Sequence, residues 1–262
     1  MIRLTALDLS LAALLVLALA ATSARSYPGL ARQLLVAALR TAIQLTLIGL
    51  VLKALFANSS LLWVAALSAV MLLVAGREVV MRQQRRFAGG WGYGIGMVSM
   101  FVSSFTVALF ALVVVVGNQP WYEPQYAIPL LGMLLGNTMN GIALALDRLT
   151  QTAWEQRETI EARLALGHGS MQAVSGIRQQ VFRSGLIPII NAMAAAGIVS
   201  LPGMMTGQIL AGAPPVEAVK YQIMIMFLIA AGAGFGTHAA VSLSVRRLFD
   251  DRERLRLDRL QR

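Results

Sequence analysis

The sequence predicts an all-α, polytopic membrane protein with about seven transmembrane helices and a helical cytoplasmic segment. Of its 262 residues, 57% are hydrophobic and only 13% are charged, about half the charged share of a typical soluble domain. Apolar runs recur at about the length of ~20 residues that a helix needs to cross a bilayer. They lie at residues 7–24, 34–56, 60–76, 95–117, 126–147, 186–210 and 219–245. We expect residues 1–262 to form a single transmembrane domain.

Positive charge is concentrated on one side of these runs. If the N-terminus is outside and the C-terminus is in the cytoplasm, only Arg3, Lys53 and Lys220 of the 22 lysines and arginines remain outside. Cytoplasmic loops of membrane proteins carry this excess of Lys and Arg. The net charge of +10 therefore indicates a multi-pass protein of the cytoplasmic (inner) membrane, in contact with the lipid bilayer, and no nucleic-acid partner. Residues 246–262 are expected to form a basic cytoplasmic tail.

The longest inner segment, residues 148–185, predicts a helix–turn–helix beneath the membrane. Apolar residues recur in it near helical spacing, and Gly167-His168-Gly169-Ser170 interrupts them. We expect Ser170 to cap the second helix. A connector between neighbouring helices usually has 2–8 residues, so the length of this segment indicates a further role. A solvated connector remains the alternative.

The run at residues 186–210 differs from the others because proline and glycine interrupt it. Pro202 and Gly203 lie near its middle, and we expect them to end or bend the helix. Lipid cannot satisfy the backbone groups that such a break frees, so the segment must face protein or a cavity. This broken helix is the expected working part of a transporter.

The broken run and residues 126–147 share a pattern. Gly-Met, Gly-amide and Gly recur at the same offsets, as Gly132-Met133, Gly136-Asn137 and Gly141, and as Gly203-Met204, Gly207-Gln208 and Gly212. Matching interruptions indicate a binding site in many transporters, whereas Gly-x-x-x-Gly is also a common packing motif. Both interpretations place the two helices in contact.

Amides and methionines in these runs are the candidates for a substrate pathway. Amides in hydrocarbon need partners, so they face protein or a cavity, and tying helices together is their alternative role. The candidate pathway residues are Asn137, Asn140, Asn191, Met204, Met205 and Gln208.

The sequence offers no catalytic set and no phosphate-binding loop. A Walker A motif needs Gly-Lys followed by Ser or Thr, and the two lysines follow Leu52 and Val219. There is no cysteine, and His168 and His238 lack metal-ligand spacing. We therefore expect no enzyme activity and no cofactor in this chain, and the sequence assigns no metal site.

Two parts of the sequence resemble a known family. Glu161-Ala162-Arg163-x-x-x-Gly167 is similar to the E-A-A-x-x-x-G cytoplasmic loop of ABC importer permeases, with Arg163 in place of the second alanine. The stretches 200–232 and 136–149 closely resemble the permeases of iron-exporting ABC transporters (Fet-type). They are also similar to the membrane subunit of a plant aluminium-tolerance ABC transporter.

The resemblance implies a permease subunit of a metal exporter, working as a homodimer with a separate ATPase that binds ATP and Mg. In that class the cytoplasmic loop forms a coupling helix on the ATPase. The docking residues so implied are Glu161, Ala162, Gly167, Ser170 and Ala173.

The substrate and the function class stay open in two respects. Iron without a chelator favours carboxylates and imidazoles, which the membrane runs barely offer, so a chelated or organic substrate is an alternative. An ATP-independent secondary transporter and a non-transporting membrane scaffold are the alternative functions.

Overall fold

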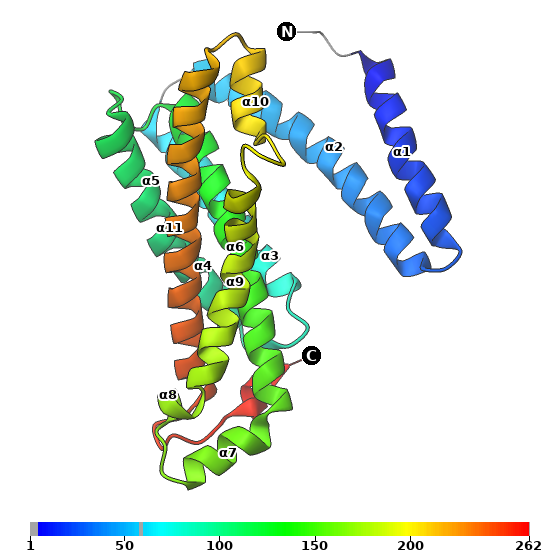
Figure 1. Ribbon diagram of the computed structural model, residues 1–262. Helices are drawn as coiled ribbons and strands as arrows, with labels where there is room; N and C mark the ends of the chain where they lie inside the picture. Colours follow the sequence, from blue (N-terminus) through cyan, green and yellow to red (C-terminus); the bar gives the residue numbers. More distant parts are fainter. Residues whose placement is uncertain (1–4, 58–59, 262) are drawn as a thin grey trace. The chain divides into compact units, whose positions relative to one another are not determined.

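The computed structural model describes residues 5–57 and 60–261, so Arg3 and Arg262 of the charge argument lie outside the described residues. The chain is almost entirely helical and divides into two compact units, Met1–Ser60 and Leu61–Arg262 (Figure 1). Six of the described helices or helical segments are long and apolar enough to cross a membrane. The expected all-α membrane fold is confirmed, with six unbroken spans and a seventh run that is interrupted.

The first unit is a helical hairpin. α1 (Ala6–Ala24) begins at a capping box in which Thr5 Oγ1 accepts from the N–H of Asp8, while the N–H of Thr5 donates to the Asp8 carboxylate. α2 (Pro28–Ala57) begins with proline, which suits the first helical position. Nearly every described side chain of both helices is exposed, and most of them are apolar. A helix without a polar face is typical of a membrane span.

The second unit is a helix bundle with one continuous span that contains π-helical turns. Its α-helices are α3 (Leu61–Met81), α4 (Trp91–Met100), α5 (Thr106–Phe110), α6 (Pro124–Glu155), α7 (Arg157–Ala165), α8 (Ser170–Ala173), α9 (Ser175–Ala195), α10 (Gly203–Leu210) and α11 (Pro215–Leu248). The π-helical segments Phe101–Phe105 and Ala111–Val116 flank α5 and complete the span that α4 begins. Figure 1 shows α6, α9 and α11 side by side, with α7 and α8 at the end where the C-terminus lies.

Glycine lets α6, α9 and α11 approach one another closely. A Cβ on Gly185 of α9 would lie 2.8 Å from the carbonyl oxygen of Gly141 on α6, and 2.8 Å from Cγ2 of Thr237 on α11. A Cβ on Gly236 of α11 would lie 2.5 Å from Cγ2 of Thr138 on α6. Lipid provides no hydrophobic force between helices, so this close packing carries their association.

The repeated glycine pattern does not form the contact between the two segments that share it. Gly203 and Gly207 of α10, and Gly136 of α6, have open space where a side chain would extend. Gly141 does sit at a close approach, but it meets Gly185 of α9. The expected contact between the two runs is confirmed for α6 with α9. In that contact, Gly141 of the pattern meets Gly185, which lies outside it.

The seventh apolar run breaks between α9 and α10. α9 ends at Ala195, Pro202 is the N-cap of α10, and Gly203 is the first residue of that helix. Within the break, Gly197 has a φ of +81°, and its N–H donates to the carbonyl of Ser200 over 2.9 Å. The N–H of Ser200 donates back to the carbonyl of Ala195 over 3.1 Å. The predicted break is confirmed, and these local hydrogen bonds satisfy part of the backbone that it frees.

The C-terminal segment folds back against the end of the bundle. β1 (Arg86–Phe87), after α3, pairs antiparallel with β2 (Leu260–Gln261). The guanidinium of Arg259, which ends the 3-10 turn before β2, donates to the carbonyls of Arg247 and Phe249 over 2.8 and 3.1 Å. The expected basic tail is therefore a folded segment in its described part.

We expect Gly185→Ala to destabilise the bundle, because the added Cβ must displace the backbone of Gly141. Overpacking of this kind costs about 1–3 kcal/mol, which a thermal melt in detergent would register as a lower unfolding midpoint. Gly136→Ala is the matched control, since its Cβ would meet no atom within 4 Å and alanine favours a helix by about 1 kcal/mol. Equal midpoints for the two variants would contradict the role assigned to the close approach.

Candidate functional site

A cavity of about 250 Å³ lies at the end of the bundle away from the C-terminal segment. Its walls come from the second π-helical segment, the first half of α6, α10 and the start of α11. The side chains in it that could contact a polar or metal-containing ligand are those of Gln125, Tyr126, Met133, Met204, Gln208, Tyr221 and Met224. Residues from four helical segments thus share one chamber.

Gln208 is the most informative residue of this cavity. Its Oε1 atom is buried and, within the described part of the chain, accepts no hydrogen bond. A buried amide without a partner costs about 1–3 kcal/mol, and such a group calls for a water, an ion or a ligand. Two of the expected pathway residues, Met204 and Gln208, therefore meet Met133 of α6 at a place suited to binding.

The other four expected pathway residues, Met205, Asn137, Asn191 and Asn140, lie outside the cavity lining. Met205 is half-buried, while Asn137 and Asn191 are exposed on the surface of this single chain. Nδ2 of Asn137 donates to the carbonyl of Met133 in its own helix, over 2.8 Å. The fold therefore does not gather Asn137 and Asn191 into one site with Gln208.

Asn140 lies toward the end of the bundle that carries α7, α8 and the C-terminal segment, which is called the basic end below. Its Oδ1 accepts a hydrogen bond from Nη1 of Arg82 over 2.5 Å. It lies about 10 Å along α6 from Met133, at 1.5 Å per residue. About two turns further along α6, the Asp147 carboxylate accepts from the N–H of Gln84 over 2.8 Å, so hydrogen bonds join α6 to the segment after α3.

A second, larger hollow of about 550 Å³ lies between α3, the π-helical span and α6. Its lining is almost wholly apolar, and only Ser68, Thr106 and the indole of Trp121 could form hydrogen bonds there. Recognition of an ion or a chelate needs several placed polar groups. The smaller cavity around Gln208 is therefore the better candidate for a substrate.

Residues 148–185 have the helix–turn–helix form that the sequence predicts. α6 continues to Glu155, α7 follows, and the turn at Gly167 has a φ of +88°, which only glycine adopts readily. Glu161 and Ala162 are exposed on α7, as is Gly167. These three residues of the expected docking surface are accessible.

The expectation that Ser170 caps the second helix is wrong. Gly169 is the N-cap of α8, and the backbone N–H of Ser170 donates instead to Oε2 of Glu253, over 3.0 Å. Ala173 is 1% exposed, and its carbonyl accepts from Nη1 of Arg163 over 3.0 Å. Ala173 therefore lies inside the segment and not on its accessible face.

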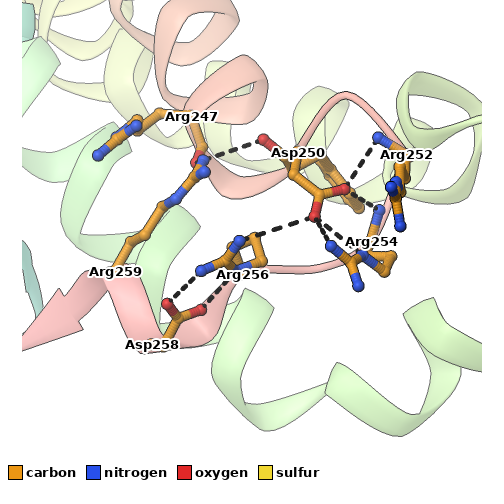
Figure 2. A network of polar contacts seen from close by, with 8 residues as sticks. Arg247, Asp250, Arg252, Arg254, Arg256, Asp258 and Arg259 are labelled. Carbon is orange, nitrogen blue, oxygen red and sulfur yellow. Dashed lines mark hydrogen bonds and ion pairs between the residues drawn. The ribbon is translucent and has the colours of Figure 1, made fainter.

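The loop after α11 is organised by the carboxylate of Asp250. Its Oδ1 accepts from the backbone N–H groups of Arg252 and Arg254, each over 3.0 Å, and its Oδ2 accepts from Nε of Arg254 over 2.9 Å (Figure 2). These bonds, with that from the N–H of Arg254 foremost, lower the pKa of Asp250 to about 2. Sequence reasoning missed this loop, because a run rich in arginine and aspartate looks like a solvated tail.

A groove of about 590 Å³ separates this loop from α7. Its lining residues are Glu161, Leu164, Gly167, His168, Arg252, Glu253, Arg254 and Leu255. The C-terminal loop and the segment of residues 148–185, called the coupling segment below after the resemblance, thus form one continuous surface at the basic end.

No three His, Cys, Asp or Glu side chains gather where they could hold a metal ion, within the residues that the structure describes. His238 packs edge-on against Phe182, with ring centroids 5.8 Å apart. A metal in the cavity around Gln208 would meet thioether sulfurs, amide oxygens and phenol oxygens, and the lining contains no carboxylate or imidazole.

The model of the Uncharacterised protein family (UPF0014) matches residues 6–249. The chain belongs to the UPF0014 family. It is 39% identical over 223 residues to the UPF0014 membrane protein slr1647 of Synechocystis, covering 85% of each chain. It is 30% identical over 260 residues to the probable iron export permease protein FetB of Escherichia coli, covering 97% of this chain and 96% of FetB.

A plant member is also similar. The chain is 35% identical over 201 residues to the UPF0014 membrane protein STAR2 of Oryza sativa subsp. japonica, covering 76% of this chain and 67% of STAR2. No solved structure matches the chain. The resemblance inferred from residues 136–149 and 200–232 is confirmed.

The loop around Asp250 should remain closed in mild acid. The pKa of the Asp250 carboxyl is lowered from 3.8 to about 2. Its contribution to the stability of the loop is therefore complete above pH 3.8 and is lost as the pH falls through 2. A carboxyl-carbon NMR titration, with the signal assigned by its loss in Asp250→Asn, should give a midpoint near 2. A midpoint near 3.8 would show that the hydrogen bonds do not form in solution.

Proposed function

We propose that this UPF0014 protein is the permease subunit of an ATP-driven metal exporter and that a separate ATPase subunit, binding ATP and Mg, drives it. The exposed turn of the coupling segment carries this proposal. It presents Glu161, Ala162 and Gly167 on an exposed surface at the basic end of the bundle, outside the membrane-spanning helices. FetB, named a probable iron export permease, aligns with nearly the whole chain and supports the direction of transport and the kind of cargo.

The charge distribution supports an inner-membrane topology with the N-terminus outside and the C-terminus in the cytoplasm. Arg82, Arg163 and Arg259 lie at one end of the second unit, where their side chains hold the segment after α3, the coupling segment and the C-terminal segment. By the positive-inside rule this end faces the cytoplasm. The cavity around Gln208 then lies toward the outer side.

A homodimer accounts for polar groups that a single chain leaves uncovered. Asn137 and Asn191 are exposed at membrane depth, as are Ile198 and Val199 in the irregular break after α9. Irregular backbone and amides at that depth must meet protein or a water-filled cavity. A second copy of the chain would provide that cover.

The cavity chemistry favours a chelated or soft metal over bare iron. Met133, Met204 and Met224 contribute thioether sulfur, and Gln208 contributes an amide oxygen without a partner. Iron prefers carboxylate and imidazole ligands, and the lining provides neither. A metal already wrapped in an organic ligand needs only such weak contacts.

The ATPase partnership is tested by co-expression with a candidate ATPase subunit, followed by purification and reconstitution in liposomes. We expect the two proteins to purify together and Glu161→Lys to lower substrate-stimulated ATP hydrolysis severalfold, because the reversed charge lies on the exposed face of α7. Glu158→Lys, also exposed and outside the groove lining, is the matched control. Transport that proceeds without ATP would favour a secondary transporter, and absence of any transport would favour a scaffold.

The cavity is tested by Gln208→Leu. This change removes a buried amide oxygen without a described partner, so the thermal midpoint should stay the same or rise while transport per assembled complex falls. Ile209→Leu on the same helix is the matched control, since Ile209 does not line the cavity. If Gln208→Leu keeps normal transport, the amide has no part in the pathway.

A further inference from the structure

We propose that Glu253, in the C-terminal loop of residues 250–255, is a positioning residue for the docking turn (residues 167–170) and so belongs to the coupling apparatus. The proposal rests on the function proposed above, because it needs α7 and its turn to be the ATPase contact. It assigns a role to a carboxylate that lies outside the coupling motif in sequence. Two independent observations, a contact and a strained backbone, converge on this residue.

The contact joins the C-terminal loop to the first residue of α8. Oε2 of Glu253 accepts the backbone N–H of Ser170 over 3.0 Å, across 83 residues of sequence. The first N–H groups of a helix have no partner within it, and a carboxylate satisfies them best. A Cβ on Gly169 would lie 3.4 Å from the same oxygen, so the carboxylate also lies against the N-cap residue of α8.

The backbone of Glu253 is held in a conformation that glutamate rarely adopts. Its φ is +57°, and it is the one non-glycine residue with positive φ among those described. Such conformations persist where the surroundings impose them, and they cluster at functional sites. The left-handed turn places the Glu253 carboxylate beside Ser170, which a relaxed turn need not do.

The surroundings that impose this conformation are the hydrogen bonds of the loop itself. The N–H of Glu253 donates to the carbonyl of Asp250 over 2.9 Å, and the N–H of Asp250 donates to the carbonyl of Arg254 over 3.2 Å. The Asp250 carboxylate closes the loop from the other side (Figure 2). These hydrogen bonds therefore hold the Glu253 carboxylate in place.

The C-terminal loop connects the docking turn directly to α11. The N–H of Arg256 donates over 2.7 Å to the carbonyl of Leu248, the last residue of α11. The other end of α11 contributes Tyr221, Met224 and Ile225 to the cavity around Gln208. A displacement of the turn by an ATPase would reach the cavity through Glu253 and α11, without passing along α9 and its break.

The test compares Glu253→Gly with Glu253→Gln in the full complex with the ATPase subunit. Glycine removes the carboxylate and also relieves the positive φ, so the thermal midpoint should be unchanged or higher. Substrate transported per ATP hydrolysed should fall severalfold, and amide hydrogen exchange of residues 167–173 should become faster. Glutamine keeps an oxygen acceptor for Ser170 and should recover much of the coupling. Asp251→Asn, at an exposed carboxylate outside the groove lining, is the matched control and should behave as the unmodified protein does.

Hydrogen exchange separates this proposal from the ATPase proposal, because it can be measured on the permease alone. Faster exchange at residues 167–173 in Glu253→Gly would support the positioning contact even if no ATPase subunit binds. Unchanged exchange would overturn it. Normal transport per ATP hydrolysed in Glu253→Gly would overturn the coupling role, as would equal losses in Glu253→Gly and Asp251→Asn.

Discussion

The second unit depends on the contact of three helices at Gly141, Gly185 and Thr237. In lipid, helices gain nothing from leaving one apolar surface for another, so their association rests on how closely the backbones meet. Because α9 lacks a side chain at Gly185, it approaches α6 to within contact of the Gly141 carbonyl and packs against α11 at the same level. This contact fixes the three helices that reach from the basic end of the bundle toward the cavity.

The break between α9 and α10 lets a short helix complete the cavity. Without it, residues 203–210 would continue along the axis of α9, and Gln208 would leave the neighbourhood of Met133. The turn that makes the break possible needs the positive φ of Gly197 and the fixed φ of Pro202, and it satisfies backbone groups through the bonds between residues 195, 197 and 200. Because of these bonds, the break leaves fewer backbone groups unsatisfied at membrane depth than the sequence suggests. The break also gives α10 an orientation independent of α9.

Hydropathy predicted which segments are helical, but it could not predict where the helices end. α6 runs on to Glu155 and α9 begins at Ser175, because helix formation continues into polar sequence as long as no residue breaks it. The site was predictable only in part. The Gly-Met-x-x-Gly-amide pattern singled out Met204 and Gln208, but not their convergence with Met224, which depends on how α10 and α11 pack. Composition alone makes residues 246–262 a solvated tail, whereas the β1–β2 pairing and the Glu253 contact join residues too distant in sequence for any local pattern to reveal.

The arrangement gives the cavity two kinds of wall. α6 and α11 are each continuous from the cavity to the basic end, where Arg82 binds Asn140 and the C-terminal loop binds Leu248 and Ser170. α10 is separated from α9 by residues 196–202, which belong to neither helix, so it does not have to follow a movement of α9. A displacement of the turn at residues 167–170 would therefore move the walls formed by α6 and α11, while α10, which carries Met204 and Gln208, responds separately. A chamber whose walls move unequally changes its volume and its contacts with a bound substrate, and a transporter needs that difference between states to bind its cargo and then release it.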